Sequence, residues 1–262
     1  MSVSIPTVLT QENYLRLVQI QQGGIRALTH LALVRGANGR PQRAYVKHFP
    51  DIAPRSLFNE WFGYIFMSAM GVPQPEAAVM LAPIPEHARL AWAFVSFEPM
   101  PHSGGTPKEI YNLASQEHIH LMAARLLACD CFARLNAADQ LCINGDRNLG
   151  NLVFTGQRSF VAIDHSDILG GYDWQVDSLR RPSAWAQAKL MELCQSVKPL
   201  QPVQCNALIA AADIAIETLY QQWQPLRAAL QDSSEGLIAL DAVWWRSLCV
   251  AQWYRERLHS LL

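Results

Sequence analysis

The spacing of hydrophobic and polar positions changes near residue 100 of this chain. Before that point, short apolar runs alternate with turn-forming segments, a pattern typical of β-strands joined by tight turns. The segments QQGG (21–24) and GANGR (36–40) are turn signals and predict a meander of the first three strands. The expected strands are YLRLVQI (14–20), LTHLALVR (28–35), AYVKHF (44–49), AAVML (77–81) and LAWAFVSF (90–97).

One helix is expected within this β-rich part. It would begin at about Ser56, a residue type that favours the N-cap, and end at Gly71, which favours the C-cap. The proline- and glycine-rich segment EPMPHSGGTP (98–107) then indicates a linker.

Beyond the linker the apolar positions recur at helical spacing. Two short β-rich runs, LVF (152–154) and FVAI (160–163), interrupt this pattern and predict one small hairpin. Helices are expected within 109–136, 184–196, 203–223 and 235–261. The pattern therefore predicts an α+β fold of two lobes, with a β-rich lobe over residues 1–98, a mainly helical lobe over residues 99–262 and a cleft between them.

Composition narrows the class of protein. The 262 residues are 50% hydrophobic, which is enough for one large domain or two lobes. A formal net charge of −1 argues against a general nucleic-acid binder, which would carry a basic excess. The N-terminus lacks a secretory pattern, and the apolar runs are too short to span a bilayer. Six cysteines at unsuitable zinc spacings are expected to be reduced and mostly buried, so we expect a cytoplasmic protein with no membrane contact.

The segment NGDRNLGNLVF (144–154), followed by FVAIDHS (160–166), concentrates candidate chemistry. The predicted hairpin would bring Asn151 and Asp164 close together, and an amide and a carboxylate are oxygen ligands that suit Mg²⁺. Asp146, five residues before Asn151, could orient a hydroxyl and accept its proton in line with a phosphoryl group. The alternative is that Asp146 and Asn151 are only turn formers, because Asn, Asp and Gly dominate turns.

This D-x-x-x-x-N loop with a hairpin and I-D resembles the protein-kinase-like fold. The run DQLCINGDRNLGNLVF resembles most closely the loops of HipA-like kinases, bacterial serine/threonine kinases whose loops read F-D-x-L-I-x-N-x-D-R-H-x-x-N. Phosphoinositide kinases and aminoglycoside phosphotransferases share a looser version. The resemblance implies that Asp146 is the catalytic base and that Asn151 and Asp164 bind the metal. The matching positions are Asp139, Leu141, Ile143, Asn144, Asp146, Arg147 and Asn151.

The first part of the chain offers the other residues that such a kinase needs. Lys47 lies on the predicted third strand, where a lysine would hold the α- and β-phosphates of ATP, and Glu60 on the next helix would orient it. The turn at Gly23 and Gly24 lacks a full G-x-G-x-x-G pattern, although its backbone amides could touch phosphates. The adenine would bond to the backbone from Glu98 to Met100, at the hinge between the lobes.

The sequence also departs from the family pattern. Asn148 stands where the family has histidine, and this position is expected to affect loop geometry more than chemistry. Arg147 is expected to brace the loop by pairing with an acid, and Asp139 to stabilise it. The chain is shorter than HipA toxins, which carry an additional N-terminal subdomain, so a toxin role is only weakly implied.

The resemblance therefore implies an ATP- and Mg²⁺-dependent kinase acting on a protein serine or threonine, with an antitoxin or regulatory protein as a possible partner. One alternative is a small-molecule kinase of the aminoglycoside type, which would need an acid-lined pocket in the helical lobe. Few acids cluster there; Asp173 and Asp177 are the nearest to the motif. The other alternative is a pseudokinase that binds ATP without catalysis, which the complete set of candidate residues disfavours.

Overall fold

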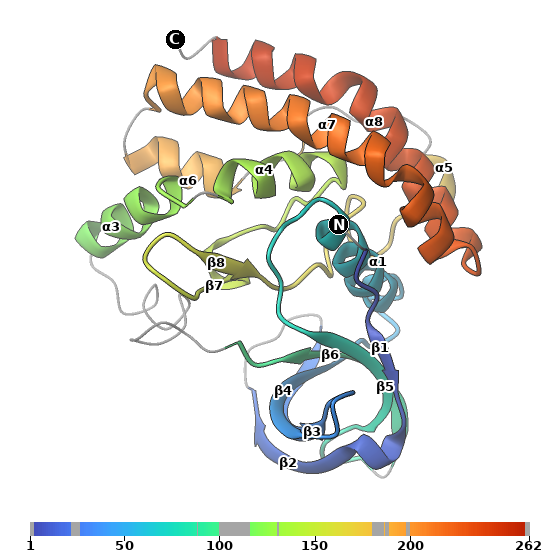
Figure 1. The fold of residues 1–262 in the computed structure, drawn as a ribbon. Helices are drawn as coiled ribbons and strands as arrows, with labels where there is room; N and C mark the ends of the chain where they lie inside the picture. The colour runs from blue at the N-terminus through green and yellow to red at the C-terminus, as the bar shows by residue number, and fades with distance from the viewer. Residues whose placement is uncertain are drawn as a thin grey trace.

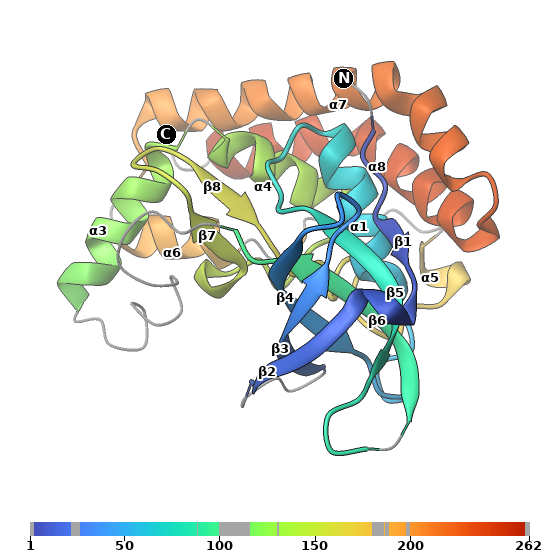
Figure 2. The ribbon, with the colours of Figure 1, turned by 60° about the horizontal axis from the view of Figure 1, so that its bottom comes forward.

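The structure is a computed structural model that describes residues 3–21, 27–87, 89–99, 116–129, 131–179, 186, 189–197 and 200–259. A curled sheet lies at one end of the molecule and two long helices lie at the other (Figure 1). One helix and a small hairpin lie between them, as a second view also shows (Figure 2). This arrangement confirms the predicted α+β class, with a β-rich first lobe and a mostly helical second lobe.

The first lobe is built on a six-stranded sheet in the order β1-β5-β6-β4-β3-β2. All neighbouring strands are antiparallel except β1 and β5, which are parallel. Each predicted strand is present, and the structure adds β1, a three-residue strand that the sequence pattern did not predict. The strands are β1 (Thr7–Leu9), β2 (Tyr14–Ile20), β3 (Leu28–Arg35), β4 (Pro41–His48), β5 (Ala77–Pro83) and β6 (Leu90–Phe97), and a short 3-10 helix, η1 (Gln11–Asn13), precedes β2.

Alternation along β4 positions the lysine of the candidate site. Ala44, Val46 and His48 are buried on the inner face of the curled sheet, and Ala44 and Val46 belong to its apolar cluster. Because successive side chains of a strand point to opposite faces, Lys47 lies on the other face, between two buried neighbours. The strand pattern thus directs Lys47 out of the sheet core.

Helix α1 (Ser56–Ala69) belongs to the core of the second lobe rather than to that of the sheet. Its buried aromatic residues Phe62 and Phe66 join the large apolar cluster formed with the helices of the second lobe. The prediction of Ser56 as N-cap is wrong: Arg55 occupies the cap and Ser56 is already helical. A distant contact explains this difference. The Arg55 N–H bonds to the Tyr172 carbonyl, which holds Arg55 at the cap, so the helix already includes Ser56.

The end of α1 lies one residue before the prediction: Met70 occupies the C-cap, and Gly71 is the residue that follows it. Gly71 has φ +69°, the left-handed conformation that glycine adopts without strain. The Val72 N–H then bonds to the Met67 carbonyl at 2.9 Å, which closes the helix end. The chain turns back from there toward β5 and passes the hairpin of the second lobe.

The second lobe contains helices on one side of a two-stranded hairpin. The predicted helices are confirmed where the structure describes them, with three differences. The segment predicted over 109–136 contains two helices, the second of which continues to Leu141; α7 is longer than expected; and the short α5 was not predicted. The elements are α3 (Gln116–Leu127), α4 (Phe132–Leu141), η2 (Leu149–Asn151), β7 (Leu152–Phe154), β8 (Phe160–Ala162), α5 (Val176–Leu179), α6 (Lys189–Val197), α7 (Pro202–Leu230) and α8 (Ser234–His259). The predicted lobe boundary between residues 98 and 99 remains a prediction.

Two further expectations concern the burial of the cysteines and the presence of membrane-spanning helices. Four cysteines are buried as expected: Cys129, Cys142, Cys194 and Cys205. Over the described ranges, none of the helices combines the length and apolar character needed to cross a membrane.

Candidate active site

Three charged side chains meet in one place, from a strand of the sheet, from helix α1 and from the segment after β8. Lys47 of β4 places its Nζ 2.6 Å from Oε1 of Glu60, on α1. The same Nζ lies 3.2 Å from Oδ1 of Asp164, which follows β8. The Glu60 side chain is buried at 1% exposed, the Lys47 side chain is 13% exposed, and the Asp164 side chain is 36% exposed. Residues that lie 13 and 117 positions apart along the chain are therefore joined in one charged cluster.

The pKa values of this cluster follow from burial and mutual attraction. Burial alone would lower the pKa of Lys47, but the two carboxylates outweigh burial and hold this pKa above its usual value. Burial would raise the pKa of Asp164, but the Lys47 ammonium and the hydrogen bonds from Ser166 hold it below its usual range. Burial raises the pKa of Glu60 to about 7, against the opposing pull of Lys47. Lys47 and Asp164 are thus the firmly charged members.

The backbone around Asp164 adopts an uncommon conformation. Asp164 has φ +61°, in the left-handed region that non-glycine residues rarely occupy. Its Oδ1 accepts a 2.8 Å hydrogen bond from the Ser166 hydroxyl, and the next N–H, of His165, donates to Glu60 Oε2 at 2.9 Å. Glu60 therefore fixes both Lys47 and the peptide that follows Asp164, so one carboxylate couples the strand, the helix and the loop.

A buried ion pair braces the loop between α4 and β7. Arg147 is 3% exposed, and its Nε lies 3.1 Å from Oδ2 of Asp139. Its Nη1 donates to the carbonyl oxygens of Ile163 at 2.6 Å and Asp164 at 3.2 Å. Asp139 also accepts a 2.9 Å hydrogen bond from the side chain of Asn144. Arg147 thus ties the loop that carries Asp146 to the segment after β8 that carries Asp164, and the predicted brace is present.

Amide side chains set the conformation of the loop itself. Asn148 donates to the Asp146 carbonyl at 2.9 Å and accepts from the Gly150 N–H at 2.8 Å. Asn151 donates to the same Asp146 carbonyl at 2.9 Å, and its own carbonyl accepts the Ile163 N–H at 3.0 Å. Asn148 therefore serves as a local cap, in keeping with the expectation that it shapes the loop.

The donor set fits a hard divalent cation. The bond from Nδ2 of Asn151 leaves its amide oxygen as the group available to a cation. Asp164 uses Oδ1 for Lys47 and Ser166 and keeps a partly exposed carboxylate. The backbone hydrogen bond from Ile163 to Asn151 links the two segments that carry these groups. Mg²⁺ accepts an amide oxygen and a carboxylate as ligands while it retains waters and phosphate oxygens.

Helix α1 is fastened to the loop after Asp164 by residues that the sequence reasoning missed. Asn59 is fully buried and donates to the carbonyls of Ser166 and Gly171, both at 2.8 Å, and accepts from the Trp174 indole at 2.8 Å. His165 packs so closely on Gly63 that an added Cβ would lie 2.4 Å from the His165 Cβ. A buried amide within an apolar helix was the available signal for Asn59.

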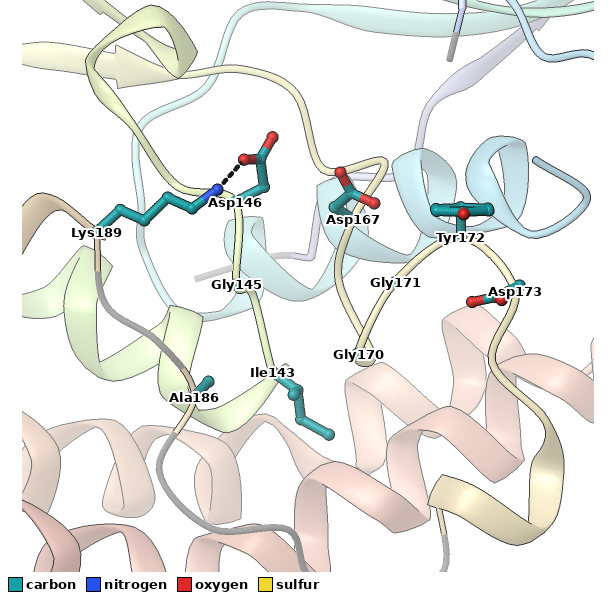
Figure 3. A pocket seen from close by; sticks show the side chains of 10 residues that line it. All are labelled: Ile143, Gly145, Asp146, Asp167, Gly170, Gly171, Tyr172, Asp173, Ala186 and Lys189. Carbon is teal, nitrogen blue, oxygen red and sulfur yellow. Dashed lines mark hydrogen bonds and ion pairs between the residues drawn. The ribbon is translucent and has the colours of Figure 1, made fainter. Parts of the chain in front are cut away.

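An open pocket of about 330 Å³ lies beside Asp146 (Figure 3). The Asp146 carboxylate is 43% exposed and accepts a 2.5 Å hydrogen bond from Nζ of Lys189, the first residue of α6. No local sequence signal indicates Lys189, which lies 43 residues from Asp146 along the chain. The lining also contains Asp167 and Asp173, so acidic side chains gather here more closely than the sequence suggested.

The remaining predicted residues lie at or beyond the edge of this cluster. The Glu98 carboxylate bonds to the Arg43 guanidinium at 2.9 Å, and its N–H donates to the Arg43 carbonyl at 2.9 Å. This pairing holds the chain where β6 ends. Gly23, Gly24 and Met100 lie outside the described residues.

Comparisons with known proteins identify the architecture. No protein-family model matches the sequence, and no curated protein matches it either. The fold matches 422 chains of solved structures. One of them is the Helicobacter pylori proinflammatory kinase CtkA, with a TM-score of 0.53 and 12% sequence identity over 98% of this chain and 99% of that chain. At this identity the likeness concerns the fold, and it is that of a two-lobed kinase.

Proposed function

We propose that this protein is an ATP- and Mg²⁺-dependent phosphotransferase of the HipA-like type, which transfers the γ-phosphoryl group of ATP to the hydroxyl of a protein serine or threonine. The observation that carries the proposal is the joining of Lys47, Glu60 and Asp164 in one cluster, with Asp146 exposed in an adjacent pocket. Phosphoryl transfer requires three parts: a cation that binds the phosphates, carboxylate and amide oxygens that hold a metal, and a separate carboxylate that orients the acceptor hydroxyl.

Each residue has a distinct role in this proposal. Lys47, oriented by Glu60, binds the α- and β-phosphates, and Asp164 and Asn151 are the side chains that would hold Mg²⁺. When bound, the ion neutralises phosphate charge and orients the phosphate oxygens. In this proposal the adenine would bond to the backbone from Glu98 to Met100, and the backbone amides of Gly23 and Gly24 would touch the phosphates.

Asp146 handles the proton of the acceptor. Its carboxylate orients the acceptor O–H and takes the proton as the acceptor oxygen forms a bond to the γ-phosphorus. The bond between that phosphorus and the β–γ bridging oxygen breaks, and ADP leaves with the electron pair. Because Arg147 and Asn148 fix the loop backbone, the carboxylate is presented to the pocket without a change of fold.

The pocket also supports a second acceptor class. Asp167 and Asp173 line it together with Asp146, an arrangement that would attract a cationic small molecule bearing a hydroxyl. This is the specific observation in favour of the small-molecule alternative. A protein acceptor with a basic residue near its serine or threonine would use the same carboxylates.

The test is incubation with Mg²⁺ and γ-labelled ATP, with a protein mixture and hydroxylated amines as separate acceptors. We expect label transfer by the wild type and a loss of at least about 100-fold in Asp146→Ala and Asp164→Ala. Asp232→Ala, which removes an exposed carboxylate between α7 and α8, is the control and should match the wild type.

The acceptor arm that becomes labelled decides between the two classes. Label on protein favours the serine/threonine kinase, and label on an amine favours the small-molecule kinase. ATP binding without label transfer or turnover above the two variants would contradict the proposal and leave a pseudokinase.

A further inference from the structure

Phosphoryl transfer places negative charge close to the catalytic carboxylate, and the catalytic loop offers no cation of its own there. Arg147 is the basic residue of the loop 144–151, but it is buried and paired with Asp139. Lys47 is held on the other side by Glu60 and Asp164. A cation at Asp146 must therefore come from another element.

Lys189 occupies that place. Its Nζ lies 2.5 Å from Oδ1 of Asp146, and both side chains line the pocket (Figure 3). They are 42% and 43% exposed, so both remain open to an entering substrate. The ammonium has three N–H donors, and the contact with Asp146 uses only one of them.

The surrounding structure fixes Lys189 in this position. Gln140, which is 1% exposed on α4, accepts the Ala186 N–H at 3.0 Å and donates to the Ala186 carbonyl at 2.9 Å. This two-bond clamp lies three residues before Lys189. On the other side, Leu190, Met191 and Cys194 are buried, which anchors the first turns of α6. The backbone of Lys189 is therefore held while its side chain reaches the pocket.

We propose that Lys189 is a catalytic residue of this site, whose ammonium bridges the Asp146 carboxylate and an oxygen of the γ-phosphoryl group during transfer. The role rests on the proposed function. A cation aimed at the transferring group stabilises its charge in the transition state, and in a preorganised site it does so without reorganisation. The same contact keeps the Asp146 carboxylate aligned until the acceptor hydroxyl arrives.

The test measures kcat and KM for ATP in Lys189→Ala and Lys189→Arg. For Lys189→Ala we expect kcat to fall about 100-fold while KM for ATP changes by less than about threefold, since the cation acts in the transition state. Lys189→Arg should retain more activity than Lys189→Ala. Added methylamine should restore part of the kcat of Lys189→Ala, an effect that a structural role would not produce.

Arg255→Ala is the matched control. Arg255 and Asp213 form another exposed ion pair, with a 2.8 Å contact and side chains 48% and 50% exposed. Loss of that pair should leave kcat unchanged. Thermal unfolding of each variant checks that the fold is retained.

Several outcomes would overturn the role. A kcat for Lys189→Ala equal to that of the wild type shows that Lys189 takes no part, and a higher kcat shows that it restrains Asp146 instead. A loss that methylamine does not restore, with Lys189→Arg equally inactive, indicates a structural role. In all three cases the wild type is active and Asp146→Ala is not, so the proposed function stands. Absence of transfer by the wild type overturns both.

Discussion

Arg147 shows how a single side chain connects the two segments that carry the candidate chemistry. It pairs with Asp139 and reaches the carbonyls of Ile163 and Asp164, all in a buried setting. Burial raises the pKa of Asp139, while Arg147 opposes that shift. The pair therefore holds a carboxylate that would otherwise be costly in the interior.

Arg147→Met should destabilise the protein by about 3–5 kcal/mol, because it leaves Asp139 buried without its partner. Urea denaturation monitored by circular dichroism measures this loss. Asp139→Asn combined with Arg147→Met should be less destabilising than the sum of the two single variants, because the uncompensated charge is then gone. Strict additivity would contradict the brace.

The residues of the candidate site were predictable from the sequence to different degrees. Asp146, Asn151 and Asp164 follow from one local motif, and Lys47 and Glu60 follow from their order on a strand and a helix. Lys189 was not predictable, because its contact with Asp146 spans 43 residues and depends on how α6 packs. Tertiary placement of this kind leaves no mark on local sequence spacing.

Elements show the same division between local and non-local information. The strands from β2 to β6 follow from alternation and turn signals, which are local. β1 has only three residues and exists because it pairs with β5, so the local pattern could not predict it. Likewise, the start of α1 is set by the contact of Arg55 with Tyr172, far away along the chain.

Strands β3 and β4 carry a buried histidine pair. His30 and His48 stack with ring centroids 5.6 Å apart, and Tyr14 contacts His30 at 3.1 Å. Burial, with the nearby His48, lowers the pKa of His30 to about 4. In the unfolded chain the His30 imidazole takes up a proton near pH 6.5, whereas in the folded protein it does so only near pH 4. The contribution of the neutral ring to the free energy of unfolding is therefore complete above pH 6.5 and is lost as the pH falls toward 4.

His30→Phe should remove part of this pH dependence. Between pH 7 and pH 5 the wild type should lose about 2 kcal/mol more stability than the variant, from the difference in proton uptake. Urea midpoints across this range provide the measurement. His120→Ala, at an exposed position, serves as control and should keep the wild-type slope. Parallel curves for His30→Phe and the wild type would contradict the buried-pair account.

Helix α1 depends on close contact with the loop after Asp164. Gly63→Ala would place a methyl group 2.4 Å from the His165 Cβ, so helix and loop must separate. We expect a loss of stability of about 1–3 kcal/mol together with reduced label transfer, because the Glu60–His165 bond is strained. Gly145→Ala, where no atom lies within 4 Å of an added Cβ, should unfold like the wild type. Equal stability of both variants would contradict the packing.

Helix α1 joins the two lobes of the molecule. This helix contributes Glu60 to the charged cluster with Lys47 of the sheet, yet its aromatic face lies in the core of the helical lobe. A further link comes from the Ala162 N–H, which bonds to the Pro73 carbonyl at 2.8 Å. The Lys47–Glu60 pair is therefore assembled as part of the fold, and the fold itself is that of a two-lobed kinase.

The most direct test of the central claim compares ATP binding and ATP turnover in the wild type and Asp146→Asn. The account predicts Mg²⁺-dependent formation of ADP by the wild type with its acceptor. Asp146→Asn should bind ATP within about twofold of the wild type but turn it over at least about 100-fold more slowly, since it loses the carboxylate that accepts the proton and that pairs with Lys189. Equal turnover by the two proteins, or none by either, would contradict the assignment of this site.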